Sequence, residues 1–302
     1  MRKQLCEALV ARSVSSEMVF LTGDLGFMAL EQLSDAMGER FINAGVSEQN
    51  MLSVAAAMAK EGMESWVYSI APFCYARPFE QIRNDICFHD LPVKIIGNGG
   101  GYGYGVMGPT HHAIEDYGIL LSLPNISAYV PVFDEDLFEV IPKVGADSHP
   151  AYLRLGRGEA PKDFIIPQYA PWRQLTTGEG KIIIAVGPIA GIYIEKIKLM
   201  PENIRPNLWA VSELPLSKNP LPKVIETQIL AGIGLIVVEE HVSRSGFGSE
   251  LALYFLEKSI SPKSFRHFFA KNHIYKYYGS QSYLRRQSSL DVDMICAAAL
   301  AP

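Results

Sequence analysis

The chain contains Val93-Lys94-Ile95-Ile96-Gly97-Asn98-Gly99-Gly100-Gly101-Tyr102-Gly103 (residues 93–103), a short apolar run that continues as a glycine-rich loop. Short apolar runs bounded by turn residues are typical of buried strands in a parallel sheet. In open α/β sheets, ligands bind beyond the carboxyl ends of such strands. The stretch therefore predicts an α/β fold and directs the search for chemistry to the loops that follow its strands.

Short apolar runs alternate with helical patterns on both sides of this stretch. Strands separated by helices predict parallel βαβ units with helices on both faces of the sheet. We therefore expect two consecutive three-layer α/β domains with mostly parallel sheets. The expected strands are 18–21, 93–96, 127–130, 181–187, 208–211 and 235–238, and the expected helices are 3–12, 48–60, 134–140 and one that begins near Gly248.

A change of composition separates the two domains. Between Gly158 and Gly180, three prolines and Trp172 interrupt any regular pattern. We predict a first domain at 1–160, a linker at 161–178 and a second domain at 179–302.

Composition excludes several classes of protein. The 302 residues carry a net charge of −5, which argues against a general nucleic-acid binder because phosphate contacts need clustered Lys and Arg. Residues 258–276 mix basic and aromatic side chains, and we expect a solvated helix-and-loop surface there. No apolar run reaches the roughly 18 residues of a membrane helix, and Glu7 interrupts any leader-like segment. The four scattered cysteines show neither zinc nor disulfide spacing, which favours a reduced cytoplasmic protein.

Glu48 lies in the segment Arg40–Asn50, at the start of an alanine-rich helical pattern. Acidic residues favour helix N-termini because they complement the helix dipole, so the position has a structural explanation. A carboxylate at the carboxyl end of a sheet can also exchange protons or hydrogen-bond a heterocycle. On spacing alone the structural explanation is favoured.

Two adjacent histidines, His111 and His112, end the glycine-rich loop. Seven glycines within residues 97–108 allow the backbone to approach a ligand closely, although neither the dinucleotide-binding spacing nor a P-loop lysine is present. Paired histidines at the end of such a loop are candidates for proton transfer. Phe73 and Arg157 are weaker candidates, for stacking on a planar ring and for binding an anion, with core packing and a surface salt bridge as their alternatives.

Taken in order, these segments resemble the C-terminal half of the transketolase family. The resemblance implies that residues 1–160 are its pyrimidine-binding domain and residues 179–302 its transketolase C-terminal-like domain. The matching elements span nearly the whole chain and are Arg40–Asn50 with Gly-Val-Ser-Glu-Gln-Asn, Arg77–Arg83, Gly108-Pro109-Thr110-His111, Leu123-Pro124-Asn125, Arg157 and Val237-Val238-Glu239-Glu240-His241. The relatives of this family include 1-deoxyxylulose-5-phosphate synthase and the beta subunits of 2-oxo acid dehydrogenases. The Gly-Pro-Thr-His motif and the Arg77–Arg83 segment favour transketolase among them.

The resemblance implies a thiamine-diphosphate-dependent enzyme that transfers a two-carbon ketol unit from a ketose or ketose phosphate to an aldehyde. Glu48 matches the glutamate that hydrogen-bonds the cofactor's aminopyrimidine, and His111 matches a histidine near the substrate oxygens. The other implied positions are Phe73, Cys74 and Arg77 around the pyrimidine, Asp24 near the thiazolium side, and Met107, His112, Arg2 and Arg157 toward the substrate.

The family's Gly-Asp-Gly motif, followed by an asparagine that binds Mg²⁺ and the diphosphate, does not occur in this sequence. Thr22-Gly23-Asp24-Leu25-Gly26 differs from it in surroundings and position. The resemblance therefore implies a separate larger subunit that ligates Mg²⁺ and the diphosphate, self-association as a dimer, and a heterotetramer as the assembly.

The substrate side departs from the family pattern. Met107 stands where the family has an acidic residue, and Gly99 stands where it has a histidine. Replacing a carboxylate that reads sugar hydroxyls alters recognition, so we expect a substrate other than the common pentose phosphates, in a specialised sugar pathway. The same losses keep two alternatives open, a non-catalytic assembly or regulatory subunit and a 2-oxo acid dehydrogenase beta-type subunit.

Overall fold

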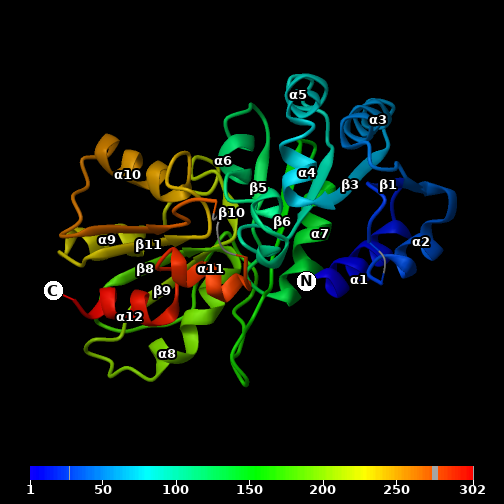
Figure 1. The fold of residues 1–302 in the computed structure, drawn as a ribbon. Coiled ribbons are helices and arrows are strands. Elements are labelled where there is room, and N and C mark those ends of the chain that lie inside the picture. Colours follow the sequence, from blue (N-terminus) through cyan, green and yellow to red (C-terminus); the bar gives the residue numbers. More distant parts are fainter. Residues whose placement is uncertain (27, 274–277, 302) are drawn as a thin grey trace.

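A computed structural model describes residues 1–26, 28–273 and 278–301, and in these ranges two mostly parallel sheets form the core (Figure 1). The strands of the first sheet are β1 (Met18–Thr22), β2 (Phe41–Asn43), β3 (Glu64–Ile70), β4 (Lys94–Asn98), β5 (Ser127–Tyr129), β6 (Ala151–Leu155) and β10 (Glu213–Leu214). Their order in the sheet is β10-β5-β6-β4-β3-β1-β2, and every pair is parallel except β10 with β5. The predicted α/β class is confirmed.

Helices cover both faces of the first sheet. One face carries α1 (Arg2–Ser13), α2 (Glu31–Met37) and α7 (Leu137–Ala146), and the other carries α3 (Glu48–Lys60), α4 (Ala71–Tyr75), α5 (Phe79–Gln81), the π-helix η2 (Ile82–Cys87) and α6 (Asp116–Leu120). The short 3-10 helices are η1 (Gly38–Arg40), η3 (Gly105–Met107), η4 (Pro109–His111) and η5 (Asp134–Asp136). The alanine-rich α3 packs closely on the sheet because Ala55, Ala56 and Ala59 on its buried face are small.

The second sheet has the order β12-β11-β8-β9-β7, with β7 (Trp172–Gln174), β8 (Ile182–Val186), β9 (Asn207–Val211), β11 (Leu235–Glu239) and β12 (Phe265–Phe269). Its faces carry α9 (Lys223–Leu230) and α10 (Phe247–Glu257) on one side, and η6 (Gly187–Tyr193), α8 (Ile194–Lys198) and α12 (Val292–Leu300) on the other. The predicted linker 161–178 contains β7, and β10 from the second domain joins the first sheet. The domain limits therefore stay a prediction, since strands cross between the two units.

The prediction of helix and loop for residues 258–276 is wrong in its centre. Phe265–Phe269 forms β12, an edge strand that pairs in parallel with β11. Local composition could not reveal this, because the partner strand lies some thirty residues earlier in the chain. Residues 274–277, which include Tyr275 of that stretch, lie outside the described residues. None of the helices in the described part of the chain is long and apolar enough to cross a membrane.

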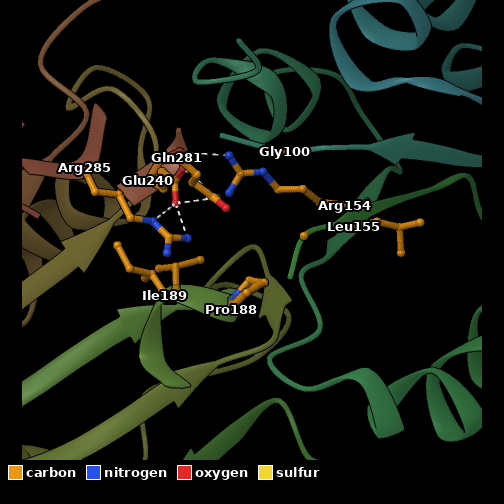
Figure 2. Close-up of a pocket in the computed structure, with 10 residues that line it drawn as sticks. Gly100, Arg154, Leu155, Pro188, Ile189, Glu240, Gln281 and Arg285 are labelled. Carbon is orange, nitrogen blue, oxygen red and sulfur yellow. Dashed lines mark hydrogen bonds and ion pairs between the residues drawn. The ribbon is translucent and has the colours of Figure 1, made fainter. Parts of the chain in front are cut away.

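Glu240, directly after β11, joins the two domains through its buried carboxylate (Figure 2). The backbone amide of Tyr102 in the glycine loop donates to it at 2.6 Å. From the second domain, Arg285 on α11 (Gln281–Gln287) donates at 2.7–2.8 Å and Gln281 at 3.0 Å. The backbone carbonyl of the same glutamate accepts from Arg154 of β6 at 2.8 Å. The cavity among these residues is about 10 Å³, which is too small for a sugar.

Glu239 and His241 add further contacts between the domains. The hydroxyl of Tyr117 on α6 donates to the Glu239 carboxylate, and the imidazole of His241 stacks on the Tyr117 ring with centroids 3.9 Å apart. The amide of Gly118 donates to His241 Nε2 at 3.1 Å. Three consecutive residues of the second domain thus contact the first domain on both sides of His111: Glu240 holds the glycine loop before it, and Glu239 and His241 hold α6 after it.

Gly101 lies in close contact with Glu240, and we expect Gly101→Ala to lower the free energy of unfolding. Its φ is +64°, and a Cβ atom there would lie 2.7 Å from the Glu240 carboxylate. Overpacking costs about 1–3 kcal/mol, to which the left-handed backbone adds about 1–2 kcal/mol. Gly38→Ala is the matched control, because Gly38 has a φ of +56° with nothing within 4 Å of the added atom. Urea unfolding should show the larger loss at Gly101; equal losses would contradict the close contact.

Candidate active site

The candidate residues lie in loops at one edge of the first sheet. Strands β1, β2, β3, β4 and β6 run parallel, so their carboxyl ends meet there. The loop that leads to Glu48 follows β2, which confirms that it belongs to this edge. The Phe73–Arg77 segment follows β3, and the glycine loop that ends at His111 follows β4.

Glu48 is the first residue of α3 and is 4% exposed. Both of its carboxylate oxygens accept hydrogen bonds from the Arg77 guanidinium, at 2.9 and 3.1 Å. The two side chains come from different loops, 29 positions apart in sequence. Since a buried carboxylate requires a partner, the ion pair explains how Glu48 is tolerated at this position.

Phe73 connects this ion pair with His111. The Arg77 guanidinium carbon lies 4.1 Å from the centroid of the Phe73 ring, which is a cation–π contact. The Phe73 ring also meets the His111 imidazole edge to face, with centroids 5.1 Å apart. His111 Nδ1 lies 3.0 Å from the Thr110 hydroxyl. The structure therefore brings four predicted residues, Glu48, Arg77, Phe73 and His111, into one continuous cluster.

Asp24 lies beside this cluster and is linked to it through the backbone. Asn43 Nδ2 donates to the Asp24 carboxylate at 2.8 Å, and the amide of Gly45 donates to Asn43 Oδ1 at 2.9 Å. A Cβ atom on Gly23 would lie 3.8 Å from Glu48 Cγ, so the loop after β1 runs close to the glutamate. Asp24 also lines a hollow of about 290 Å³ at the ends of β1 and β2.

Two predicted residues do not reach this cluster. Cys74 is fully buried, with its thiol near the carbonyl oxygens of Ala71 and Ile96, and burial raises its pKa. His112 is 2% exposed and packs against Tyr102 and His273 between the domains; burial first, and then the charge of His273, lowers its pKa to about 4. His111 is the last residue of the 3-10 helix η4, whereas His112 has extended backbone, so the chain changes conformation between the two histidines.

The residues predicted to contact substrate are more dispersed. Met107 in η3 is 55% exposed. Arg2 is exposed and lies close enough to Tyr104 for its charge to oppose the rise in the phenol's pKa that burial causes. Arg157, also exposed, lines a cavity of about 400 Å³ between the domains, with Arg286 on its far wall.

Tyr104 is a candidate that the sequence analysis did not assign. Gly99 has a φ of +80°, and a Cβ atom there would lie 2.2 Å from the Tyr104 ring. The Tyr104 hydroxyl accepts a hydrogen bond from Asn98 at 2.6 Å, and its ring lies 6.4 Å from that of His111. Tyr104 thus fills the space that a side chain at position 99 would take. In the sequence, the only indication of this packing was that Gly99, which leaves space for a ring, precedes Tyr104 by five residues.

We expect Arg77→Met to raise the pKa of His111. Partial burial lowers this pKa first, and the positive charge of Arg77 lowers it further. At neutral pH the imidazole is therefore uncharged and able to accept a proton. Removing the charge leaves only the burial effect, so an NMR titration should show a higher pKa. His149, which pairs with Asp90, is the internal control. An unchanged or lower pKa at His111 would mean that the charge of Arg77 does not act on this imidazole.

Comparisons with known proteins agree with this arrangement. The family model described as "Transketolase, pyrimidine binding domain" matches residues 5–162. A relative from Actinobacillus succinogenes, named as one of the subunits of apulose-4-phosphate transketolase, is 27% identical over 272 residues, 87% of this chain and 85% of that protein. The 1-deoxy-D-xylulose-5-phosphate synthase of Carboxydothermus hydrogenoformans is 31% identical over 237 residues, but these cover 36% of its length.

Solved structures of transketolases also superpose on this chain. A split gene transketolase, described as an inactive beta4 tetramer, superposes with a TM-score of 0.82 at 27% identity, over 99% of this chain and 97% of that one. Transketolase from Leishmania mexicana shares the fold, with a TM-score of 0.77 at 16% identity over 44% of its length. The chain therefore belongs to the transketolase family, carries its pyrimidine-binding domain, and corresponds to the small subunit of a split transketolase.

Proposed function

We propose that this chain is the pyrimidine-binding half of a heteromeric, thiamine-diphosphate-dependent transketolase that transfers a two-carbon ketol unit from a ketose or ketose phosphate to an aldehyde. The observation that carries the proposal is the cluster of Glu48, Phe73 and His111 at the carboxyl edge of the sheet. It combines a buried carboxylate, an aromatic face and an imidazole, the groups needed to hold a heterocycle beside a reacting sugar.

The residues of the cluster fit the pyrimidine end of the cofactor. The Phe73 ring already carries a flat cationic group on its face at 4.1 Å, and Glu48 directs both oxygens toward that group. Ser69 Oγ, buried and without a hydrogen-bond partner, lies near Gly23 and Glu48. When bound, thiamine diphosphate supplies the nucleophilic carbon and the electron sink. Glu48 would hydrogen-bond the ring, and neutral His111 would exchange a proton with a substrate oxygen.

We assign Mg²⁺ and the diphosphate to a larger partner subunit, on the basis of the family resemblance. Within the described ranges, no group of three or more His, Cys, Asp or Glu side chains could hold a metal ion. We further propose that the chain self-associates and is inactive alone, as the split gene transketolase relative is described. We propose a heterotetramer as the assembly, on the same family resemblance. We propose the cytoplasm as the location, which would suit four cysteines that are all free and buried.

We propose a substrate other than the common pentose phosphates. Met107, 55% exposed, stands where the family has an acidic residue, and Val106 beside it is apolar and 65% exposed. Tyr104 fills the space above Gly99. Two relatives, from Actinobacillus succinogenes and Phocaeicola vulgatus, are named for apulose 4-phosphate, which makes that sugar the first donor to test.

The test is a panel of ketose donors and aldehyde acceptors, assayed with the complex of this chain and its larger subunit. We expect the highest kcat/KM with a donor other than xylulose 5-phosphate. We expect Met107→Asp to raise the kcat/KM for xylulose 5-phosphate. The matched control is Met294→Asp, since Met294 is similarly exposed, at 47%, on α12 in the other domain. If xylulose 5-phosphate and ribose 5-phosphate are preferred, the specialised substrate is disproved. If no pair reacts, the non-catalytic alternative takes its place.

A further inference from the structure

We propose that Arg77 occupies the position of the cofactor's aminopyrimidine in the chain alone, and that it turns out toward solvent before the cofactor can bind. This inference rests on the proposed function, because it takes Glu48 as the pyrimidine's hydrogen-bond partner. It adds a competing group, built into the same chain, that sets the affinity for the cofactor.

The contacts of Arg77 are those that a planar heterocycle would use. Its guanidinium donates hydrogen bonds to both Glu48 oxygens, at 2.9 and 3.1 Å. At the same time it covers the Phe73 ring, with its central carbon 4.1 Å from the ring centroid. Side chain 77 thus occupies both the polar and the aromatic surface of the site.

The chemistry of the two groups is alike. A guanidinium is flat and delocalised, carries N–H donors in its plane, and stacks on aromatic rings. An aminopyrimidine is also flat, and its ring nitrogen presents an N–H donor in the ring plane once it is protonated. A carboxylate can accept from either group, and an aromatic face can stack with either. The two cannot be accommodated together, since one carboxylate and one ring face serve both.

Arg77 is free to leave and Glu48 is not. Arg77 is 48% exposed in a short connection between α4 and α5, whereas Glu48 is 4% exposed on the first turn of α3. A rotation about the side-chain bonds of Arg77 reaches solvent without moving a helix. Glu48 would then be left buried without a partner, which is unfavourable. The incoming ring must replace this partner, so the observed cofactor affinity is lower than that of the site without Arg77.

The test is to measure the dissociation constant of thiamine diphosphate by calorimetry, with Mg²⁺ and the complex of this chain with its larger subunit. Arg77→Met keeps most of the side chain's length but removes its charge and its donors. We expect it to tighten binding about tenfold, the equivalent of one moderate polar interaction. Arg83→Met is the matched control, because Arg83 is exposed on η2 and its hydrogen bond goes to the neighbouring Asn84.

A second variant separates competition from a general structural effect. In a Glu48→Ala background, Arg77 has lost the group over which it competes, so Arg77→Met should change the dissociation constant far less than in wild type. An affinity that is unchanged or weaker in Arg77→Met overturns the proposal, and so does an equal gain in both backgrounds. A complex that fails to bind thiamine diphosphate with or without Arg77 overturns it as well.

The same samples distinguish this inference from the proposed function. Ketol transfer is measured in parallel with the wild-type complex. Tighter cofactor binding in Arg77→Met without ketol transfer in any complex would disprove the proposed reaction and leave the competition standing. Ketol transfer together with unchanged cofactor affinity would support the reaction and disprove the competition.

Discussion

Glu48→Ala is expected to lower the kcat of the assembled complex by about 10²–10⁴-fold, the usual contribution of a group that transfers a proton in the transition state. The effect follows from the position of Glu48, which is buried at the end of the sheet and is joined through Arg77 to the Phe73 ring. The chain should stay folded, because the partner of Glu48 is the half-exposed Arg77, which reaches water once the carboxylate is gone. Steady-state kinetics, with circular dichroism to check the fold, measures both.

Glu61→Ala provides the control for this loss. Glu61 is an exposed carboxylate at the other end of α3, so its removal changes the charge of the same helix without touching the site. Its kcat should lie within about twofold of wild type, a change of about 0.4 kcal/mol or less. If Glu48→Ala were as active as Glu61→Ala, the carboxylate would have no part in catalysis.

Arg154→Met is expected to lower the free energy of unfolding by about 3–5 kcal/mol, the range for breaking a buried ion pair. Arg154 is 4% exposed, and its Nε donates to the fully buried Asp116 at 2.8 Å. Its Nη2 also donates to the carbonyls of Ala113 and Glu240, at 2.9 and 2.8 Å. The substitution removes the charge that compensates Asp116 and a contact between the domains, and urea unfolding at neutral pH measures the loss.

Arg244→Met is the control for this variant, because Arg244 is exposed on the loop before α10. Its free energy of unfolding should stay within about 0.5 kcal/mol of wild type. A loss for Arg154→Met as small as that of Arg244→Met would mean that the network around Glu240 contributes little to joining the domains.

The sequence predicted the architecture well where a signal was local. Val93–Ile96 and Lys181–Gly187 are short apolar runs, and both became central parallel strands. The helical pattern of 48–60 matches α3 residue for residue. Because the carboxyl ends of parallel strands share an edge, predicting the strand at 93–96 also predicted the edge at which His111 would lie. The strand that leads to Glu48, β2, was not among the expected strands.

Features decided by distant partners were missed. Strand β3, Glu-Ser-Trp-Val-Tyr-Ser-Ile at 64–70, mixes polar and aromatic residues and has no continuous apolar run, yet it lies between β1 and β4. Val237–His241 was visible as a motif, but its role in joining the domains depends on residues more than a hundred positions earlier, such as Tyr117 and Tyr102.

The side-chain arrangement of the site could be predicted only in part. The sequence placed Phe73, Cys74 and Arg77 in one segment. It could not show that the Cys74 thiol faces the core while Arg77 reaches Glu48 and covers the Phe73 ring. The ion pair of Arg77 with Glu48 joins loops after two different strands, and nothing in the local sequence of either loop specifies it.

The most direct test of the account is to purify this chain and its larger subunit separately and to assay ketol transfer with thiamine diphosphate and Mg²⁺, using each chain alone and the two mixed. The account predicts no transfer by either chain alone and transfer by the mixture that saturates at equal amounts of the two chains. Transfer by the larger subunit alone would contradict it, because Glu48 and His111 of this chain would then be dispensable.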